Sequence, residues 1–159
     1  MCGICGKAVF GSGGRERVTE QLLRAMSHQM VHRGPDSDGA LLRHYPNLSV
    51  GLGHRRLSII DLSDAGSQPM PNEDHTIWVI LNGEIYNFAE QRSILESKGH
   101  KFRSHTDTEV ILHLYEEHGE SFVDYLRGMF AIAIWDEPNQ RLVLVRDRLG
   151  QKPIFYSES

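Results

Sequence analysis

The sequence predicts an α+β fold with mostly antiparallel sheets, and three observations support this prediction. Several short runs of apolar residues look like strands, and they come in pairs joined by short turns. Other segments repeat apolar residues at the spacing of an amphipathic helix. The order is strands, helix, strands, two helices and strands, which argues against a doubly wound parallel sheet. Two apolar sheets need cover on their outer faces, and a four-layer helix–sheet–sheet–helix (αββα) sandwich supplies it.

The first third of the chain is predicted to form a strand, a helix and a second strand. Residues 2–10 are small and apolar and predict a strand. The next apolar residues recur at helical spacing and predict a helix that runs to about His32. Residues 11–14 are predicted to form a turn, because they lack the Gly-Lys-Ser/Thr ending of a nucleotide-binding loop. Residues 48–53 are the next predicted strand.

The middle of the chain is predicted to form a strand and two helices. Residues 76–81 are strand-like, and Asn87 is placed to cap a helix that Gly99 ends. Residues 106–109 have the Thr-x-x-Glu form of a capping box, which predicts the start of a third helix. Gly119 is predicted to end this helix.

The last part of the chain is predicted to be a hairpin. Residues 129–135 and 141–146 are strand-like, and residues 136–140 contain a proline and an asparagine that favour a turn between them. The apolar run at 129–135 is also the longest in the chain, and it is far too short to cross a bilayer.

The composition is that of an ordinary protein domain without a nucleic-acid or membrane partner. The length of 159 residues suits a single domain over residues 1–159. Lys plus Arg number 17 and Asp plus Glu number 21, so the net charge of −4 does not favour a phosphate backbone. The start of the chain does not have the pattern of a signal peptide, and two cysteines cannot build a disulfide framework. We therefore expect a cytoplasmic protein.

Cys2 is a candidate nucleophile because of its position. Removal of Met1 would make Cys2 the first residue and place its thiol beside a free α-amino group. Such an amine has a reference pKa near 8 and can act as a base close to neutral pH. A terminal cysteine can therefore carry both nucleophile and base. Cys5 is predicted to be a small buried side chain without a catalytic role.

Six short motifs occur along the chain in an order that resembles a known family. They are Cys2-Gly3-Ile4-Cys5-Gly6, His32-Arg33-Gly34-Pro35-Asp36, Arg55-Arg56-Leu57-Ser58-Ile59-Ile60-Asp61, Asn82-Gly83-Glu84-Ile85-Tyr86-Asn87, Thr106-Asp107-Thr108-Glu109 and Arg146-Asp147-Arg148-Leu149-Gly150-Gln151-Lys152-Pro153. Together they resemble the glutaminase domain of glutamine-hydrolysing asparagine synthetase, a class II glutamine amidotransferase of the N-terminal-nucleophile kind. The resemblance covers essentially the whole chain and implies a four-layer αββα fold.

The resemblance implies that Cys2 attacks glutamine and forms a thioester, with the α-amine of Cys2 as the base. It gives Asn82 and Gly83 the role of an oxyanion hole, made of a side-chain amide and a main-chain N–H. Two such donors suit a developing negative oxygen. The alternative interpretation is that Asn82-Gly83 is simply a turn.

The resemblance also implies a set of substrate-binding residues. Arg56 corresponds to the arginine that binds the α-carboxylate of glutamine, and its forked guanidinium suits that task. Asp107 corresponds to the acid that binds the α-ammonium, although acidic residues are also common in the first turn of a helix. Ile59 and Glu84 match further substrate-contacting positions. Arg55 is interpreted as a solvated charge.

Other polar residues are given no direct part in the chemistry. Arg33 and Asp36 belong to a segment whose glycine and proline would close a helix, and we expect them to brace the site. His28 and His32 are four residues apart, but the segment lacks the glutamate of a zinc helix and no Cys or His cluster completes a site. We therefore expect no metal site in this chain and no cofactor for glutamine hydrolysis.

The resemblance implies a partner that these residues do not supply. In the family, ammonia passes to a synthetase domain, in cis or in trans, that uses ATP and Mg²⁺ to make asparagine. We expect that domain to be absent here, because no Ser-Gly-Gly-x-Asp-Ser stretch is present. Two alternatives stay open: an amidotransferase serving another acceptor and a non-catalytic regulatory relative. Arg56 and Asp107 argue against a peptide hydrolase on the same fold, because they suit a free amino acid. A homodimer is also possible.

Overall fold

The chain forms two compact units, each built on one antiparallel sheet. The computed structural model describes residues 2–11, 17–58 and 63–158. The first unit comprises the chain up to residue 59 together with 67–69, and the second comprises 60–66 and the rest from residue 70.

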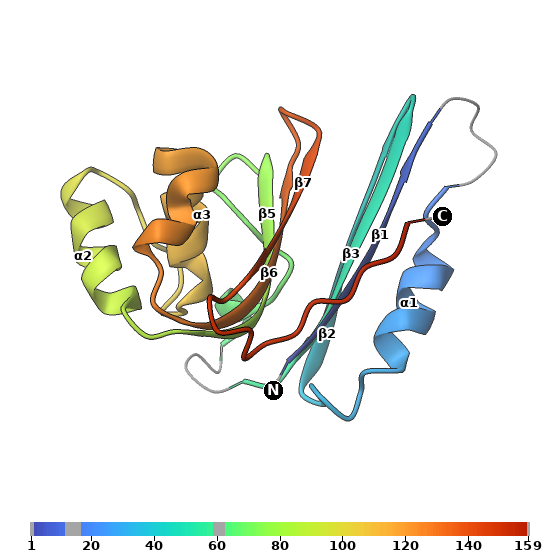
Figure 1. The fold of residues 1–159 in the computed structure, drawn as a ribbon, viewed down its shortest axis with the longest axis horizontal. Helices are drawn as coiled ribbons and strands as arrows, with labels where there is room; N and C mark the ends of the chain where they lie inside the picture. The colour runs from blue at the N-terminus through green and yellow to red at the C-terminus, as the bar shows by residue number, and fades with distance from the viewer. Residues whose placement is uncertain (1, 12–16, 59–62, 159) are drawn as a thin grey trace. The chain divides into compact units, whose positions relative to one another are not determined.

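The sheet of the first unit has three strands in the order β1-β3-β2. Its strands are β1 (Gly3–Phe10), β2 (Ser37–Tyr45) and β3 (Leu48–Arg56), and both pairs are antiparallel. Helix α1 (Glu20–His28) lies along one face of this sheet (Figure 1). The central strand β3 is buried along almost all its length, so it forms the core of the unit.

Helix α1 packs closely on β3 because of a glycine. Thr19 caps the helix by accepting a hydrogen bond of 3.2 Å from the N–H of Leu22. Leu23 is fully buried. A Cβ atom at Gly51 would lie 2.7 Å from side-chain atoms of both Leu23 and Val18, so only glycine allows this approach.

The sheet of the second unit has four strands in the order β4-β5-β6-β7. They are β4 (Met70–Pro71), β5 (Ile77–Ile85), β6 (Gly128–Asp136) and β7 (Arg141–Arg146), and every adjacent pair is antiparallel. The hairpin between β6 and β7 is as predicted, but its turn covers residues 137–140, because Asp136 belongs to β6.

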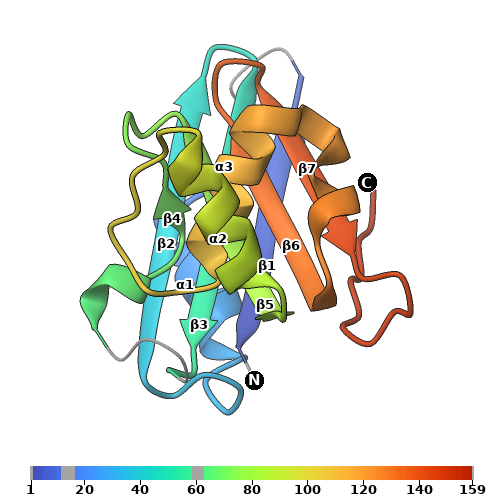
Figure 2. The same ribbon diagram turned by 90° about the vertical axis from the view of Figure 1, so that its left-hand side faces the viewer.

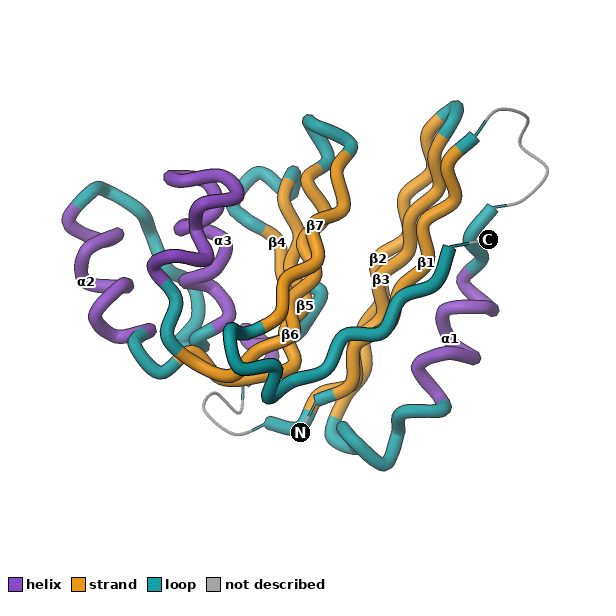
Figure 3. Tube along the Cα trace, in the orientation of Figure 1, coloured by secondary structure: helices purple, strands orange, loops and turns teal. Residues whose placement is uncertain are grey.

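The helices of the second unit cover one face of its sheet. Helix α3 (Thr108–His118) lies between the sheet and helix α2 (Phe88–Ser97), as Figures 2 and 3 show. Short 3₁₀ helices occur at Asp64–Gly66 and Gly119–Tyr125. The apolar core between α3 and the sheet includes Val79, Leu81, Val110, Ile111, Leu114, Phe122, Ile132 and Ile134.

Several predicted boundaries are wrong by a few residues. Helix α1 ends at His28 and not near His32, and a turn follows it. The strand predicted at 76–81 extends to Ile85, and the one predicted at 48–53 extends to Arg56. Strand β2 was not predicted at all. The predicted turn at 11–14 lies mostly outside the described residues.

The helix ends of the second unit follow the predictions only in part. Gly99 and Gly119, with φ of 103° and 56°, follow α2 and α3 as predicted. Asn87 precedes α2, but its side chain bonds the main chain of Tyr125 and Arg127 instead of the helix. The predicted capping box is wrong because Asp107, and not Thr106, is the residue before α3.

Within residues 2–11, 17–58 and 63–158, no helix is both long and apolar enough to cross a membrane. Both sheets are antiparallel, with α1 on a face of the first and α2 and α3 on one side of the second. The predicted α+β class with antiparallel sheets is therefore confirmed in each unit.

Candidate functional site

Cys2 lies immediately before β1, beside the end of β3. The pairing of Gly3 with Arg55 continues the antiparallel register so that Cys2 comes opposite Arg56. The Cys2 Sγ atom is 3.5 Å from the main-chain nitrogen of Leu57, which donates a hydrogen bond to it, and 3.8 Å from the Leu57 oxygen. Cys2 is only partly buried. The Leu57 main chain thus holds the thiol in place.

The segment between α1 and β2 forms hydrogen bonds to Cys2 and to the end of β3. The Arg33 Nε atom donates a hydrogen bond of 3.1 Å to the main-chain oxygen of Cys2. Asp36 makes two hydrogen bonds where β3 ends. Its N–H donates to Arg56 O (3.1 Å), and its Oδ2 atom accepts from Ser58 N (2.7 Å). The sequence-based prediction that Arg33 and Asp36 brace the site agrees with these contacts.

Gly34 is the residue that lets this segment approach β3. A Cβ atom at Gly34 would lie 2.4 Å from the Arg55 carbonyl carbon and 2.7 Å from the Arg56 nitrogen. Arg55 Nε in turn donates to Gly34 O at 2.9 Å, and its guanidinium lies 3.3 Å from Asp38. The interpretation of Arg55 as a solvated charge is wrong, because its side chain is 12% exposed and holds this segment. Arg56 itself is buried at the end of β3.

Cys5 differs from Cys2 in its surroundings. Burial raises the pKa of the Cys5 thiol, and the hydrogen bond with Ser27, at 3.7 Å, offsets this only in part. A thiol with a raised pKa is a poor nucleophile at neutral pH. The raised pKa fits the predicted lack of a catalytic role, but Cys5 is only partly buried and not buried as predicted.

Asn82 and Gly83 lie within β5, so the interpretation of this pair as a turn is wrong. Asn82 pairs with Ala131 and Gly83 with Phe130. A Cβ atom at Gly83 would lie 2.2 Å from Met129 O, so the close approach of β6 requires glycine. Asn82 is 5% exposed, and its Oδ1 atom has no hydrogen-bond partner among the described residues. An unpartnered buried amide oxygen is costly unless a ligand donor contacts it, and this acceptor is distinct from the Nδ2 donor that the predicted oxyanion role would use.

The main-chain N–H of Gly83 points away from β6. Both polar main-chain groups of its partner, Phe130, bond Asp147 instead, with N···Oδ2 of 3.2 Å and O···N of 2.8 Å. Gly83 and Phe130 are therefore a non-hydrogen-bonded pair of the ladder. On the other edge of β5, β4 pairs only with Trp78 and Val79 within the described chain, so Gly83 has no strand partner there.

Asp107 uses the same edge of β5. Its Oδ2 atom accepts a hydrogen bond of 2.8 Å from the N–H of Ile85, two residues beyond Gly83 and therefore on the same side of the strand. Burial raises the pKa of Asp107, and the nearby charge of Glu84 adds to the rise, while main-chain hydrogen bonds from Ile85 and Thr108 oppose it. A buried carboxylate of this kind favours a cationic ligand.

The structure thus gathers two groups of predicted residues, one in each unit. Cys2 and Arg56 lie together in the first, and Asn82, Gly83 and Asp107 in the second. Glu84 is exposed beside the second group. Ile59 and Met1 lie outside the described residues. The main-chain contact of Leu57 with the thiol was not predicted, since it does not depend on residue type.

Comparison with known proteins shows what the whole chain is similar to. An asparagine synthetase (glutamine-hydrolysing) of Bacillus subtilis is 44% identical over 158 residues, which is 99% of this chain and 20% of that protein. The asparagine synthetase of Sandersonia aurantiaca is 44% identical over 155 residues, covering 98% of this chain and 28% of its own length. The chain therefore spans about a quarter of the length of these relatives.

A solved structure shows the same fold. The glutamine phosphoribosylpyrophosphate amidotransferase of Bacillus subtilis superposes with a TM-score of 0.71 at 19% identity, over 94% of this chain and 38% of that one. This likeness shows that the two chains share a fold, in agreement with the predicted α+β class. The profile that describes the glutamine amidotransferase domain matches residues 1–159. The chain belongs to the glutamine amidotransferase domain family.

Proposed function

We propose that this domain hydrolyses glutamine to glutamate and ammonia through a thioester on Cys2. The observation that carries the proposal is the setting of the two thiols. Both cysteines are partly buried, but Cys2 accepts a hydrogen bond from the Leu57 N–H, whereas burial raises the pKa of the Cys5 thiol. The similarity to glutamine-hydrolysing asparagine synthetases supports the same reaction.

The reaction needs one nucleophile and one base. After removal of Met1, the free amine of Cys2 takes the thiol proton, and Sγ attacks the side-chain carbonyl carbon of glutamine. The tetrahedral oxyanion is stabilised by the Asn82 amide and the Gly83 N–H. Collapse breaks the carbon–nitrogen bond, and the protonated amine gives its proton to the leaving ammonia. Water then attacks the thioester, which releases glutamate and restores the thiol.

Recognition of glutamine uses its two charged groups. Arg56 binds the α-carboxylate, and Asp107 binds the α-ammonium, while Ile59 and Glu84 line the same substrate. The buried carboxylate of Asp107 supports this assignment, because a cation beside it compensates its desolvation. This pair of charged residues suits a free amino acid and not a peptide chain. The hydrolysis requires no metal or cofactor.

The test compares the two cysteines in the purified chain with Met1 removed. Cys2→Ala should abolish release of glutamate and ammonia from glutamine, whereas Cys5→Ser should retain it. Both variants should keep the far-ultraviolet circular dichroism of the parent. Unchanged activity in the Cys2 variant would show that another group is the nucleophile.

The ammonia is assigned to an ATP-dependent synthetase domain, in cis or in trans, that makes asparagine in the cytoplasm. Support comes from the named relatives, of which this chain spans only 20% and 28%. ATP and Mg²⁺ belong to that domain. In the longer protein, Cys2→Ala should stop glutamine-dependent asparagine formation but leave the reaction with added ammonium salt intact. An amide of a different acceptor as the ATP-dependent product would support the alternative assignment.

A further inference from the structure

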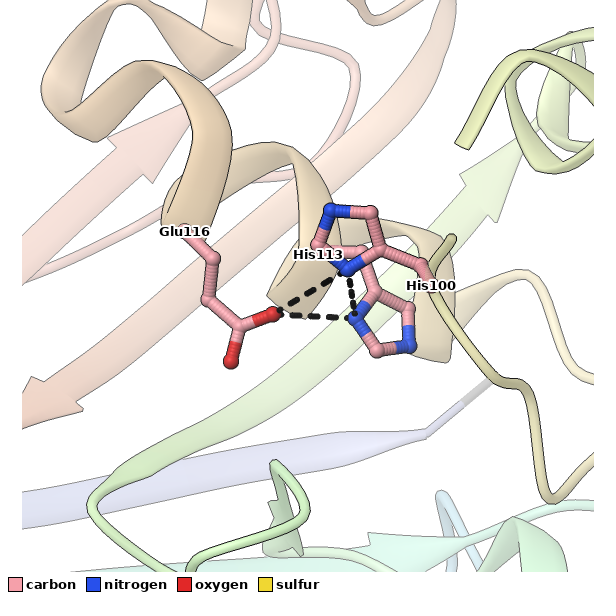
Figure 4. Close-up of side chains that lie close together, drawn as sticks. All are labelled: His100, His113 and Glu116. Carbon is pink, nitrogen blue, oxygen red and sulfur yellow. Dashed lines mark hydrogen bonds and ion pairs between the residues drawn. The ribbon is translucent and has the colours of Figure 1, made fainter. Parts of the chain in front are cut away.

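Two histidines and a glutamate of the second unit gather where the segment after α2 meets α3. His113 and Glu116 lie one turn apart on α3, and His100 precedes that helix. The Nδ1 atoms of His100 and His113 are 3.1 Å apart. Glu116 Oε2 lies 3.0 Å from His113 Nδ1 and 3.6 Å from His100 Nδ1 (Figure 4). Three potential ligand atoms thus form a compact triangle.

The triangle has the dimensions of one face of a metal coordination sphere. Zinc binds histidine nitrogen and carboxylate oxygen at about 2.0–2.2 Å in tetrahedral geometry, which puts neighbouring ligand atoms roughly 3.3–3.5 Å apart. The three separations here, 3.0, 3.1 and 3.6 Å, lie around that value. Two imidazoles and one carboxylate are also a known zinc ligand set, with water in the fourth position.

Hydrogen bonds from residues outside the triangle orient its ligand atoms toward one another. Glu117 Oε1 lies 3.1 Å from His100 Nε2, so the proton of the neutral ring is assigned to Nε2 and the lone pair of Nδ1 faces the cluster. Lys98 holds the other Glu117 oxygen at 2.7 Å. The Asn72 amide donates to Glu116 Oε1 at 2.8 Å, which leaves Oε2 for the cluster. Carboxylate support of a ligating histidine is typical of metal sites.

Packing fixes the third ligand. His113 is 1% exposed, and its ring contacts that of Phe102 with centroids 4.6 Å apart. Its Nε2 atom has no hydrogen-bond partner among the described residues, so only Nδ1 makes polar contacts. The side chains of His100 and Glu116 are 16% and 23% exposed, which leaves solvent access on their side of the triangle.

We propose that His100, His113 and Glu116 bind one divalent transition-metal cation, for which Zn²⁺ is the best match. The cation would join the segment before α3 to the helix itself. That segment contains Asp107, so metal binding would stabilise the loop that presents this carboxylate. The proposed glutamine hydrolysis does not use this metal, and the role is structural. The competing arrangement is a single proton shared among the same three atoms.

The test measures metal binding in the untagged chain after chelator treatment and alkylation of its cysteines. Zn²⁺ is titrated in competition with a chromophoric chelator, and Co²⁺ is added separately to record its visible absorption. We expect one equivalent of Zn²⁺ and the intense bands of tetrahedral Co²⁺. His100→Ala and Glu116→Gln should weaken Zn²⁺ binding by on the order of 100-fold or more, and Glu117→Gln by roughly 10- to 100-fold.

His118→Ala is the matched control, because His118 lies on the same helix and stacks on Tyr125 outside the triangle. Its zinc affinity should equal that of the parent. Binding of less than one equivalent by the parent, or equal affinity in Glu116→Gln and the control, would overturn the proposal. Circular dichroism of each variant separates ligand loss from unfolding. Since the measurement does not involve glutamine, its failure is distinct from failure of the proposed hydrolysis.

Discussion

The N–H of Ile85 donates a hydrogen bond of 2.8 Å to the Oδ2 atom of Asp107, which ties the start of α3 to the end of β5. This contact fixes one oxygen of a carboxylate that is 6% exposed. It also makes asparagine a nearly isosteric replacement, because the Asn Oδ1 atom can accept the same bond. Asp107→Asn therefore removes the charge while keeping the contact.

Asp107→Asn should weaken glutamine use through loss of the charge that faces the α-ammonium. A charge-assisted hydrogen bond is worth about 1.5–3 kcal/mol, so kcat/KM should fall roughly 10- to 100-fold. Arg56→Ala should cause a loss of similar size from the carboxylate side. Steady-state glutamate release measures both. Asp124→Asn, an exposed carboxylate change, is the control, and a loss below about threefold at Asp107 would indicate a structural role only.

The same substitution should increase stability at neutral pH. Burial raises the folded-state pKa of Asp107 above its ordinary value of 3.8. The folded protein therefore binds more protons than the unfolded one between these two pKa values, and stability falls as pH rises through that window. The Asp107→Asn variant has no carboxylate at this position, so its stability does not fall in this way. Its Tm should exceed that of the parent at pH 7, and the difference should shrink as pH falls toward 3.8.

Thermal unfolding of parent and variant across acidic and neutral pH checks this prediction. The expected pattern is opposite to that of a carboxylate stabilised by an ion pair, whose loss lowers Tm most at neutral pH. A lower Tm of Asp107→Asn at pH 7 would show that the hydrogen bonds of the Asp107 carboxylate stabilise the folded state by more than its burial costs. Gain of stability with loss of activity would identify a site residue.

The parts of the fold with strong local signals were predictable. The β6–β7 hairpin combines apolar runs with a turn sequence, and Gly99 and Gly119 mark the ends of their helices. Strand β2 was not predictable in the same way. Of its nine residues only Leu41 is buried, so the strand lacks a continuous apolar pattern. Its pairing with β3 depends on residues distant in the sequence.

The local signals of the site were partly misleading. Asn82-Gly83 is a frequent turn dipeptide, but the pairing of β5 with β6 continues through it to Ile85. Tertiary pairing therefore overrides the local preference. Thr106 to Glu109 resembles a capping box, yet Glu109 accepts hydrogen bonds from the N–H groups of Arg103 and Ser104 outside the helix. Residue identities pointed to the site, whereas these contacts required the structure.

Arg33 should act as a positioning residue for the nucleophile. Its Nε atom donates to the main-chain oxygen of Cys2, so Arg33→Ala should let Cys2 shift from the Leu57 N–H. Loss of a charge-assisted bond predicts a fall in kcat of roughly 10- to 100-fold, with a smaller change in KM. Arg24→Ala, which removes an exposed arginine paired with Glu20, is the control.

Alkylation of Cys2 by iodoacetamide separates positioning from general destabilisation. The rate at which iodoacetamide alkylates Cys2 should change in Arg33→Ala at temperatures where the protein stays folded. The same rate should not change in the Arg24→Ala control. Partial recovery in Arg33→Lys would support a role for the positive charge. Unaltered kcat and alkylation rate in Arg33→Ala would show that the bond to Cys2 is not needed.

The final prediction is that Met1 must be removed before the domain hydrolyses glutamine. While Met1 is attached, the nitrogen of Cys2 is part of a peptide bond. Resonance occupies the lone pair of an amide nitrogen, so it cannot accept the thiol proton at neutral pH. Once Met1 is removed, the same nitrogen is an amine with a reference pKa near 8. The unprocessed chain should therefore lack the base.

Two preparations of the same sequence test this, one with Met1 retained and one with Met1 removed, as verified by mass spectrometry. Glutamate release is measured in both, and acetylation of the new amine in the processed sample supplies a second block of the base. Activity should appear only in the processed, unacetylated protein, although all preparations keep the thiol of Cys2. Equal rates in the retained and processed samples would exclude the α-amine as the base, and the terminal-nucleophile mechanism would then have to be abandoned.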